Sequence, residues 1–330
     1  MSEKKEPMFR FVTAKTAQNE AEQETVEEPV KKEIVFNQNI TDDEIKTALD
    51  SGKEEFDKGK RMMIAGIVVA LISVFMTSFM KVILMVGGVV LACFGFAKKI
   101  KAKKDVKMDA GIHVIHNAMT EVFDEVNYQP DKGLDLYDVA DVQMGFPFSF
   151  NEVESDDLVE GIYHGLKIRM GDVKLNYVTT STDEDGNEHS RTETVFKGIW
   201  LICDFGKELT ADMTISEGIH TKKNRIKTDN EKFNKKFGVY SLNPHDVFYI
   251  LTPHMMEYIL QMDKRCGGDT YMNFSREGKL TIAINTGHET FEIDSFNMSA
   301  AQMREKFVNE VRYITDLLDE LKLVDTMYKN

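Results

Sequence analysis

The sequence predicts an α+β protein in which a two-helix transmembrane hairpin precedes an antiparallel-sheet domain with a long C-terminal helix. Residues 62–97 form a largely apolar run with one charged side chain, Lys81. After Asp157 apolar residues alternate with polar ones, as in β-strands, and from Met303 they recur at helical spacing. This order favours a sheet with helices packed on it.

Residues 1–61 precede the apolar run. Residues 1–40 are rich in Glu, Gln, Lys and Thr and have too few apolar side chains to form a core, so we expect a disordered acidic tail. In residues 41–61, Thr41 and Glu44 have the spacing of a capping box, which predicts a juxtamembrane helix. The opening MSEKKEPMFR is polar and unlike a secretory signal.

Lys81 divides the apolar run into two segments, residues 62–80 and 82–97. As helices they would be about 28 and 24 Å long, near the roughly 30 Å of a bilayer core, whereas one unbroken helix would be far too long. Because an unpaired ammonium in hydrocarbon costs roughly 3 kcal/mol or more, we expect Lys81 at the tip of the hairpin. A re-entrant hairpin, and one span followed by a buried soluble helix, are the alternatives.

Basic residues on both sides of the hairpin predict its orientation. Lys58, Lys60 and Arg61 precede it, and residues 98–107 carry a net charge of +5. By the positive-inside rule both termini are then cytoplasmic, in a cell-membrane protein with two spans.

Small residues predict how the two spans pack. In an antiparallel hairpin, Gly66 lies at the depth of Ala92, and Ala70 lies at the depth of Gly88. Such pairs let helix backbones approach closely in lipid, where there is little hydrophobic drive between helices.

The acidic charge lies behind the membrane segment. The chain carries −14 in all, and residues 108–330 carry −16. Affinity for nucleic acid comes mainly from clustered Lys and Arg, so no nucleic-acid partner is expected. Cys93, Cys203 and Cys266 form no CxxC pair, which is typical of a reducing compartment.

Residues 98–130 are expected to form a basic stalk and an amphipathic helix, with apolar residues at helical spacing as far as Val126. Residues 131–330 then form the cytoplasmic α+β domain. Its expected strands include residues 157–170, 172–180, 191–205 and 210–216, and a helix running into a strand at 229–241.

Cap and turn residues place the remaining elements. Thr252 and Pro253 predict a helix start, and a hairpin is expected around Glu277–Gly278. Ser299 with Gln302 forms a capping box before the C-terminal helix. A pleckstrin-like barrel, about six strands closed by a helix, is the alternative topology, although such a barrel does not need the helix after Pro253.

Several motifs resemble a bacterial membrane-protein family, domain of unknown function 3137. They are an FKG strand, an FE..F.VY segment and an ILTP..ME helix start, which fall here on Phe196, Lys197, Gly198, Phe233, Phe237, Val239, Tyr240, Ile250, Leu251, Thr252, Pro253, Met256 and Glu257. The HDVFYILTP stretch departs from the family's acidic-Ala-Arg-Tyr run, so any role of that arginine is absent. The resemblance covers about residues 60–325. It implies a membrane-anchored cytoplasmic domain and no assigned activity.

Candidate chemical groups are few. The sequence lacks the P-loop, GxSxG and HExxH motifs. His113 and His116 are spaced for a metal but have no third ligand in sight, and DEDGNE at residues 183–188 reads better as a hairpin turn than as a calcium loop. His288 with Glu289, and Cys203 with Asp204, read as isolated pairs. Lys197 and Gly198 read as a bulge or edge position rather than a ligand site.

We therefore expect no catalytic, cofactor-binding or metal-binding residues. The favoured function is a non-enzymatic, membrane-anchored binding or scaffold module, with the lipid bilayer and either a protein partner or a second copy as its partners. The alternative is a membrane-bound, hydrolase-like enzyme whose site is assembled on the sheet.

Overall fold

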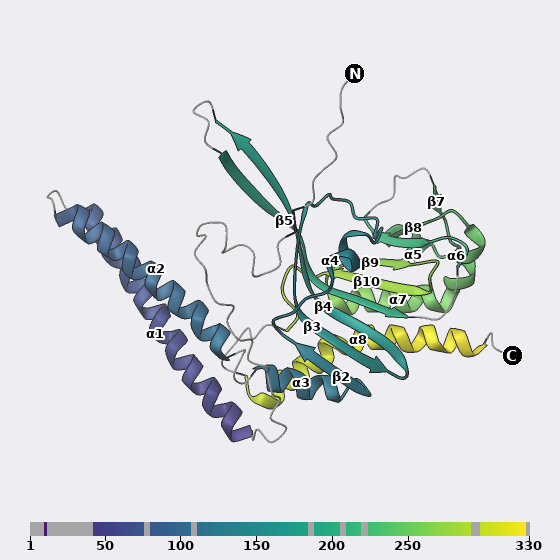
Figure 1. The fold of residues 1–330 in the computed structure, drawn as a ribbon, viewed down its shortest axis with the longest axis horizontal. Helices are drawn as coiled ribbons and strands as arrows, with labels where there is room; N and C mark the ends of the chain where they lie inside the picture. Colours follow the sequence, from purple (N-terminus) through teal and green to yellow (C-terminus); the bar gives the residue numbers. More distant parts are fainter. Residues whose placement is uncertain are drawn as a thin grey trace, which may run out of the picture. The chain divides into compact units, whose positions relative to one another are not determined.

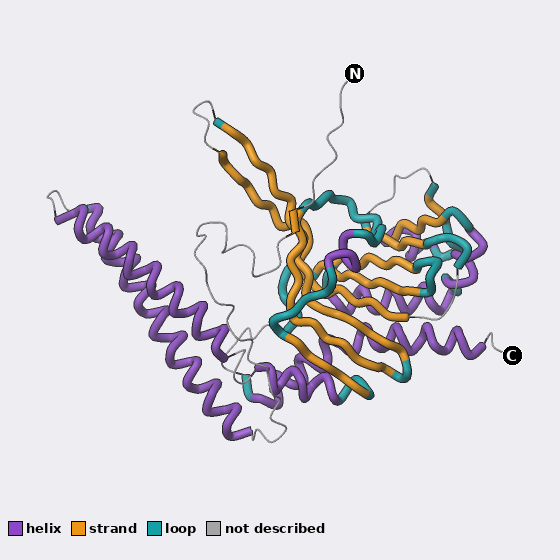
Figure 2. Tube along the Cα trace, in the orientation of Figure 1, coloured by secondary structure: helices purple, strands orange, loops and turns teal. Residues whose placement is uncertain are grey.

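A computed structural model describes residues 10–11, 42–75, 80–106, 111–183, 188–204, 209–218, 224–291 and 298–327 (Figures 1 and 2). The chain divides into two compact units, one of residues 1–29, 119–291 and 308–330, the other of residues 30–118 and 292–307. Of the expected tail, only β1 (Arg10–Phe11) lies within the described residues.

Two long helices pair to form a hairpin, α1 (Asp42–Val74) and α2 (Met80–Val106). The juxtamembrane helix expected at residues 41–61 and the start of the apolar run form one continuous helix, α1, because no proline interrupts residues 42–74. For the same reason α2 continues through the lysines that were expected to form a stalk. The two helices are antiparallel neighbours, as expected, since Gly59 lies against Lys99 and Gly66 lies against Ala92. Most of the expected turn near residues 77–81 lies outside the described residues, and Lys81 is the second residue of α2.

The hairpin packs through small residues at intervals of seven. The buried ones are Gly52, Gly59, Gly66 and Ser73 on α1, and Gly88, Gly95 and Ala102 on α2. A Cβ added to Gly66 would lie 2.4 Å from the backbone N of Ala92, and one added to Gly88 would lie 2.6 Å from that of Ala70. The predicted pairing of small residues is therefore confirmed, and a repeat of seven indicates a left-handed supercoil.

The segment after α2 differs from expectation. Helix α3 (Ile112–Thr120) ends well before Val126, which lies instead in β2 (Glu125–Gln129). The apolar residues near Val126 fit both helical and strand spacing. The pairing of residues 125–129 with β3 (Glu152–Tyr163) makes this segment a strand. Short helix α4 (Leu136–Ala140) follows β2.

β3 and β4 (Leu166–Thr182) form a hairpin, which the sequence analysis had placed several residues later. His164 and Gly165 form its two-residue loop, with φ of 46° and 81°. Positive φ at both residues is the geometry of a tight hairpin turn. β4 then pairs with β5 (Glu188–Asp204).

The remaining elements match most of the expected caps and turns. They are β6 (Met213–Glu217), β7 (Arg225–Ile226), α5 (Glu231–Lys236), β8 (Phe237–Ser241), α6 (Pro244–Ile250), α7 (Pro253–Cys266), β9 (Asp269–Phe274), β10 (Lys279–Asn285) and α8 (Ala300–Met327). Thr252 caps α7 through its side chain, and Ser299 and Gln302 form the predicted capping box of α8.

The strands form one mostly antiparallel sheet in the order β1-β3-β4-β5-β10-β9-β6-β8-β7, with β2 also on β3. In the described chain this is an open sheet, not the pleckstrin-like barrel considered from the sequence. The difference arises because β10 returns across a long sequence separation to pair with β5, which no local pattern encodes.

One face of the sheet carries an aromatic core. Trp200, the sole tryptophan in the sequence, is 0 % exposed there. Phe146, from the segment after α4, packs 6.0 Å from the Trp200 ring and 4.7 Å from that of Tyr271. Because the only indole lies in this core, its fluorescence reports unfolding of the sheet domain.

Candidate functional site

A β-bulge in β3 creates a buried polar site. The register shifts between Asp156, which pairs with Asp172 on β4, and Val159, which pairs with Met170. Two residues of β3 therefore face the single residue Gly171. Asp157, the first of the two, has a φ of 55°, a conformation that aspartate tolerates better than most residues.

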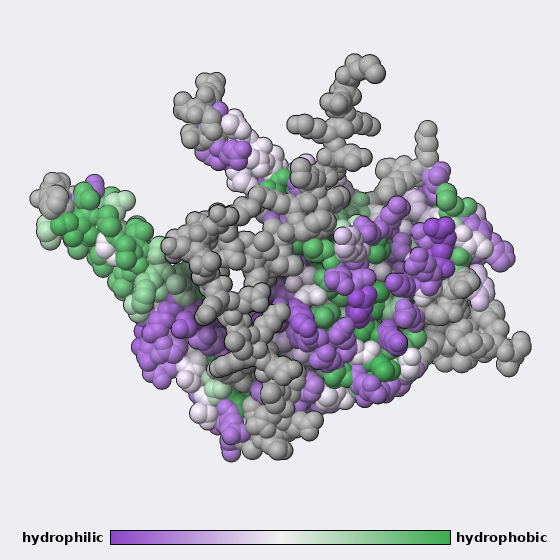
Figure 3. Space-filling model, viewed as in Figure 1, coloured by the Kyte–Doolittle hydropathy of each residue, from purple (hydrophilic) through white to green (hydrophobic). Residues whose placement is uncertain are grey.

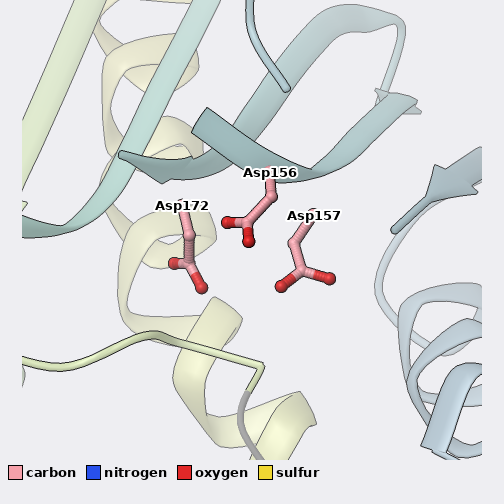
Figure 4. A group of neighbouring side chains, drawn as sticks. All are labelled: Asp156, Asp157 and Asp172. Atoms are coloured by element: carbon pink, nitrogen blue, oxygen red, sulfur yellow. The ribbon is translucent and has the colours of Figure 1, made fainter. Parts of the chain in front are cut away.

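The bulge brings three carboxylates together. Asp156 and Asp157 of β3 and Asp172 of β4 direct their side chains toward a common point (Figure 4). One carboxylate oxygen from each lies within 4.8 Å of the other two. Asp157 is 0 % exposed and Asp172 is 2 % exposed, whereas Asp156 is partly exposed.

Neighbouring segments hold these side chains in place. The Tyr128 hydroxyl of β2 donates a short hydrogen bond to Asp157, and the Thr290 N–H donates to Asp172 Oδ2 at 2.8 Å. The Ser155 hydroxyl donates to the Asp172 carbonyl at 2.9 Å and accepts from the Leu134 N–H at 3.0 Å. Strand β2, the segment before α4 and the segment after β10 therefore meet at the bulge.

Burial and the neighbouring Asp157 carboxylate raise the pKa of Asp172 well above its usual range. Like charges this close are not stable together without protons or a cation between them. Carboxylate oxygens are the ligands that Ca²⁺ and Mg²⁺ prefer. The cluster is therefore suited to a hard cation, a role that the sequence analysis assigned to no residue.

The groups considered from the sequence do not gather at this site. Burial lowers the pKa values of His113 and His116, which lie on α3. Of the DEDGNE turn, residues 184–187 lie outside the described residues, and Asp183 contacts His189 at 3.0 Å.

The contacts of the other residues considered from the sequence indicate structural roles. Glu289 forms an ion pair with Lys197 at 3.2 Å. Burial raises the pKa of the Cys203 thiol to about 12, so it is not a thiolate nucleophile at neutral pH. A Cβ on Gly198 would lie 2.0 Å from the Ile284 carbonyl oxygen, so this glycine permits close approach of β5 and β10.

The motif residues that carried the family resemblance are mainly core and cap residues. Phe196, Phe233, Phe237, Val239, Ile250, Leu251 and Met256 are buried. Thr252 accepts a hydrogen bond from the Met255 N–H at 3.2 Å. The motif therefore describes how the domain folds rather than a reactive site.

A second polar cluster joins α5, α7, β6 and β9. Lys236 Nζ lies 2.6 Å from Glu217 and 3.1 Å from Asp263, and the Thr270 hydroxyl donates to Asp263. Burial, with Glu217 adding to it, raises the pKa of Asp263 to about 6 against the opposing effect of Lys236. Cys266, whose thiol pKa is also raised by burial, lies beside this cluster.

The Asp263 shift predicts a pH dependence of stability. Folded Asp263 holds its proton up to pH about 6, whereas the unfolded side chain loses it near pH 4. The folded state thus binds more protons in this window, and the free energy of unfolding should fall as pH rises from 4 to 6. Urea unfolding followed by Trp200 fluorescence should show a shallower fall in Asp263→Asn. Identical slopes would contradict the assignment.

Residues 194–323 match the model of the family described as protein of unknown function (DUF3137). The match confirms the family resemblance over this range and does not extend to residues 60–193. No curated protein matches the sequence. Among solved structures, the crystal structure of the mycobacterial trehalose monomycolate transport factor A, TtfA, is similar with a TM-score of 0.34 and 12% identity, covering 63% of this chain and 93% of that chain.

Proposed function

We propose that this chain, whose residues 194–323 match the DUF3137 model, is a membrane-anchored module that holds an acidic binding domain at the cytoplasmic face. The observation that carries the proposal is the α1–α2 hairpin. Its helices bury their small residues against each other and direct their large apolar side chains outward.

The outward face of the hairpin is the surface expected against lipid. Its exposed apolar side chains are Ile64, Ile67, Val68, Leu71, Ile72, Val74, Phe75, Met80, Val82, Ile83, Met85, Val86, Val89, Val90, Phe94, Phe96 and Ile100. Figure 3 shows this apolar surface on the hairpin. Soluble proteins rarely expose so large a contiguous apolar patch.

α2 is the one helix in the described ranges that is long and apolar enough to cross a membrane. In α1 the uncharged stretch runs from Met62 to Val74, about 20 Å at roughly 1.5 Å per residue. We propose that this stretch of α1 belongs to the other span, and the close pairing of α1 with α2 supports this.

Charges mark the cytoplasmic end of the proposed hairpin. Lys98 forms an ion pair with Glu55 at 2.9 Å, and Lys99 lies over the Phe56 ring. Lysines here would also be attracted to the anionic inner leaflet, by about 1 kcal/mol each. This attraction supports a position for this end of the hairpin at the inner interface.

The binding or scaffold role is favoured over the membrane-bound enzyme. Within the described residues, the reactive groups considered from the sequence lie apart, and most of the motif residues belong to the core. The partner that we propose for the domain is another protein or a second copy of the chain.

Cysteine labelling tests the topology. In a Cys93→Ser background, Lys81→Cys should react with a membrane-impermeant maleimide in intact cells, because the hairpin tip lies at the far interface. Lys103→Cys should react only after permeabilisation. Labelling of position 103 in intact cells, or of position 81 only after lysis, would contradict the proposed orientation.

A further inference from the structure

The aspartate cluster contains a buried oxygen whose hydrogen-bonding capacity is unused. Asp172 Oδ2 accepts from the Thr290 N–H at 2.8 Å, but Asp172 Oδ1 has no hydrogen-bond partner among the described residues. Asp172 is only 2 % exposed, and its carboxylate is directed toward Asp156 and Asp157 (Figure 4). An unsatisfied buried carboxylate oxygen is costly, so a ligand for it is expected.

The spacing of the three carboxylates fits one cation. Oxygens bound to Ca²⁺ at about 2.3–2.6 Å can be at most about 4.6–5.2 Å apart. One oxygen from each aspartate lies within 4.8 Å of the others, inside that limit. Mg²⁺ usually keeps several waters and takes only one or two carboxylates, whereas Ca²⁺ accepts about six to eight oxygens in a flexible geometry. Partly exposed Asp156 gives the cation a route from solvent.

We propose that Asp156, Asp157 and Asp172 bind a divalent cation with a preference for oxygen ligands, with Ca²⁺ favoured because it accepts several carboxylates together. The cation supplies the positive charge that three clustered carboxylates require, and it gives Asp172 Oδ1 a partner. This site is independent of the membrane anchor, so it stands or fails separately from the proposed function.

The cation would connect parts of the sheet domain that are distant in sequence. Tyr128 of β2 bonds to Asp157, and Thr290, which follows β10, bonds to Asp172. Ser155 links the same site to the segment before α4 through Leu134. Binding would therefore order these connections together, and the stability of the domain would depend on the cation concentration.

Titration of the full-length protein in detergent tests the proposal. After treatment with EDTA, CaCl₂ should bind at one site by calorimetry and should raise the midpoint of thermal unfolding, followed by Trp200 fluorescence, by several degrees. Tb³⁺, an oxygen-seeking substitute for Ca²⁺, should show luminescence excited through nearby Tyr128, and CaCl₂ should displace it.

Variants distinguish this site from nonspecific binding. Asp156→Asn and Asp172→Asn should each weaken binding of Ca²⁺ at least tenfold and remove the thermal shift. Asp204→Asn, an exposed aspartate outside the cluster, should bind within twofold of the wild type. If Asp172→Asn does not fold, partly exposed Asp156→Asn decides the question, because its native fold can be verified by Trp200 fluorescence.

Two results would overturn the proposal. The first is a wild-type protein that responds to neither CaCl₂ nor MgCl₂, which would mean that the cluster is held together by shared protons. The second is an equal loss of binding in Asp204→Asn and Asp156→Asn, which would place the bound ions on the general acidic surface. If MgCl₂ produces the same response as CaCl₂, the cation site is supported, and the site also accepts the smaller ion.

Discussion

Replacing Gly88 with leucine should separate α1 from α2, whereas the same change at adjacent Gly87 should leave the hairpin packed. A Cβ at Gly88 would lie 2.6 Å from the backbone N of Ala70 and 2.7 Å from the carbonyl oxygen of Gly66. Backbone atoms cannot turn aside as side chains do, so the helices must move apart. A Cβ at Gly87 meets nothing within 4 Å.

The size of the effect follows from overpacking. Forcing extra atoms into a packed interface costs about 1–3 kcal/mol, and the loss of close helix contacts in lipid adds to it. Leucine at Gly87 adds apolar surface toward the proposed lipid face. The two variants have the same composition, so any difference between them measures the interface.

Cross-linking measures the separation. Glu55 and Lys98 form an ion pair across the hairpin, so cysteines at these positions should be joined by a short bismaleimide. In a background lacking Cys93 and Cys266, Gly88→Leu should reduce the yield of this intrachain product several-fold, and Gly87→Leu should not. Equal yields in the two variants would show that the hairpin tolerates a wider spacing than its glycines indicate.

Gly198→Ala should have the largest effect on the sheet domain. A methyl group there would lie 2.0 Å from the Ile284 carbonyl oxygen and 2.9 Å from the Thr286 N. Relief would require β5 and β10 to separate at the centre of the sheet, beside Trp200. We expect a loss of about 3 kcal/mol or more in the free energy of unfolding, above the usual range for overpacking because the clash is with backbone.

Lys197→Ala is the matched control for this change. It alters the adjacent residue of the same strand and removes only the partly exposed ion pair with Glu289. Such pairs contribute about 0–1 kcal/mol. Urea unfolding followed by Trp200 fluorescence compares the two variants. A Gly198→Ala protein as stable as Lys197→Ala would mean that the strands adjust without cost.

Features that depend on local chemistry were predictable from the sequence. The apolar run interrupted by Lys81 indicated two antiparallel helices, and helical spacing then placed Gly66 opposite Ala92. Thr252 and Ser299 were recognised as caps because a cap needs only its own side chain and the next few N–H groups. The turn at Glu277–Gly278 was recognised for a similar reason.

The sites that depend on strand pairing were not predictable in this way. Asp172 is separated from Asp156 by a hairpin, and its place beside Asp157 depends on the bulge that shifts the register of β3. The expected strand boundaries ran through this hairpin, which hid the pairing. A positive φ at a non-glycine residue leaves only a weak mark on composition, so nothing in the sequence indicated that Asp157 is buried at a bulge.

The sequence by itself determined the pair of apolar helices, the order of most elements, and the acidic character of the residues that follow the lysines of α2. These depend on composition and on spacings of a few residues. Only the tertiary structure decided that β10 lies between β5 and β9, and that three aspartates converge with Asp172 buried. Register and bulges arise from contacts between distant segments, and their free energy belongs to the packed sheet rather than to any one stretch of chain.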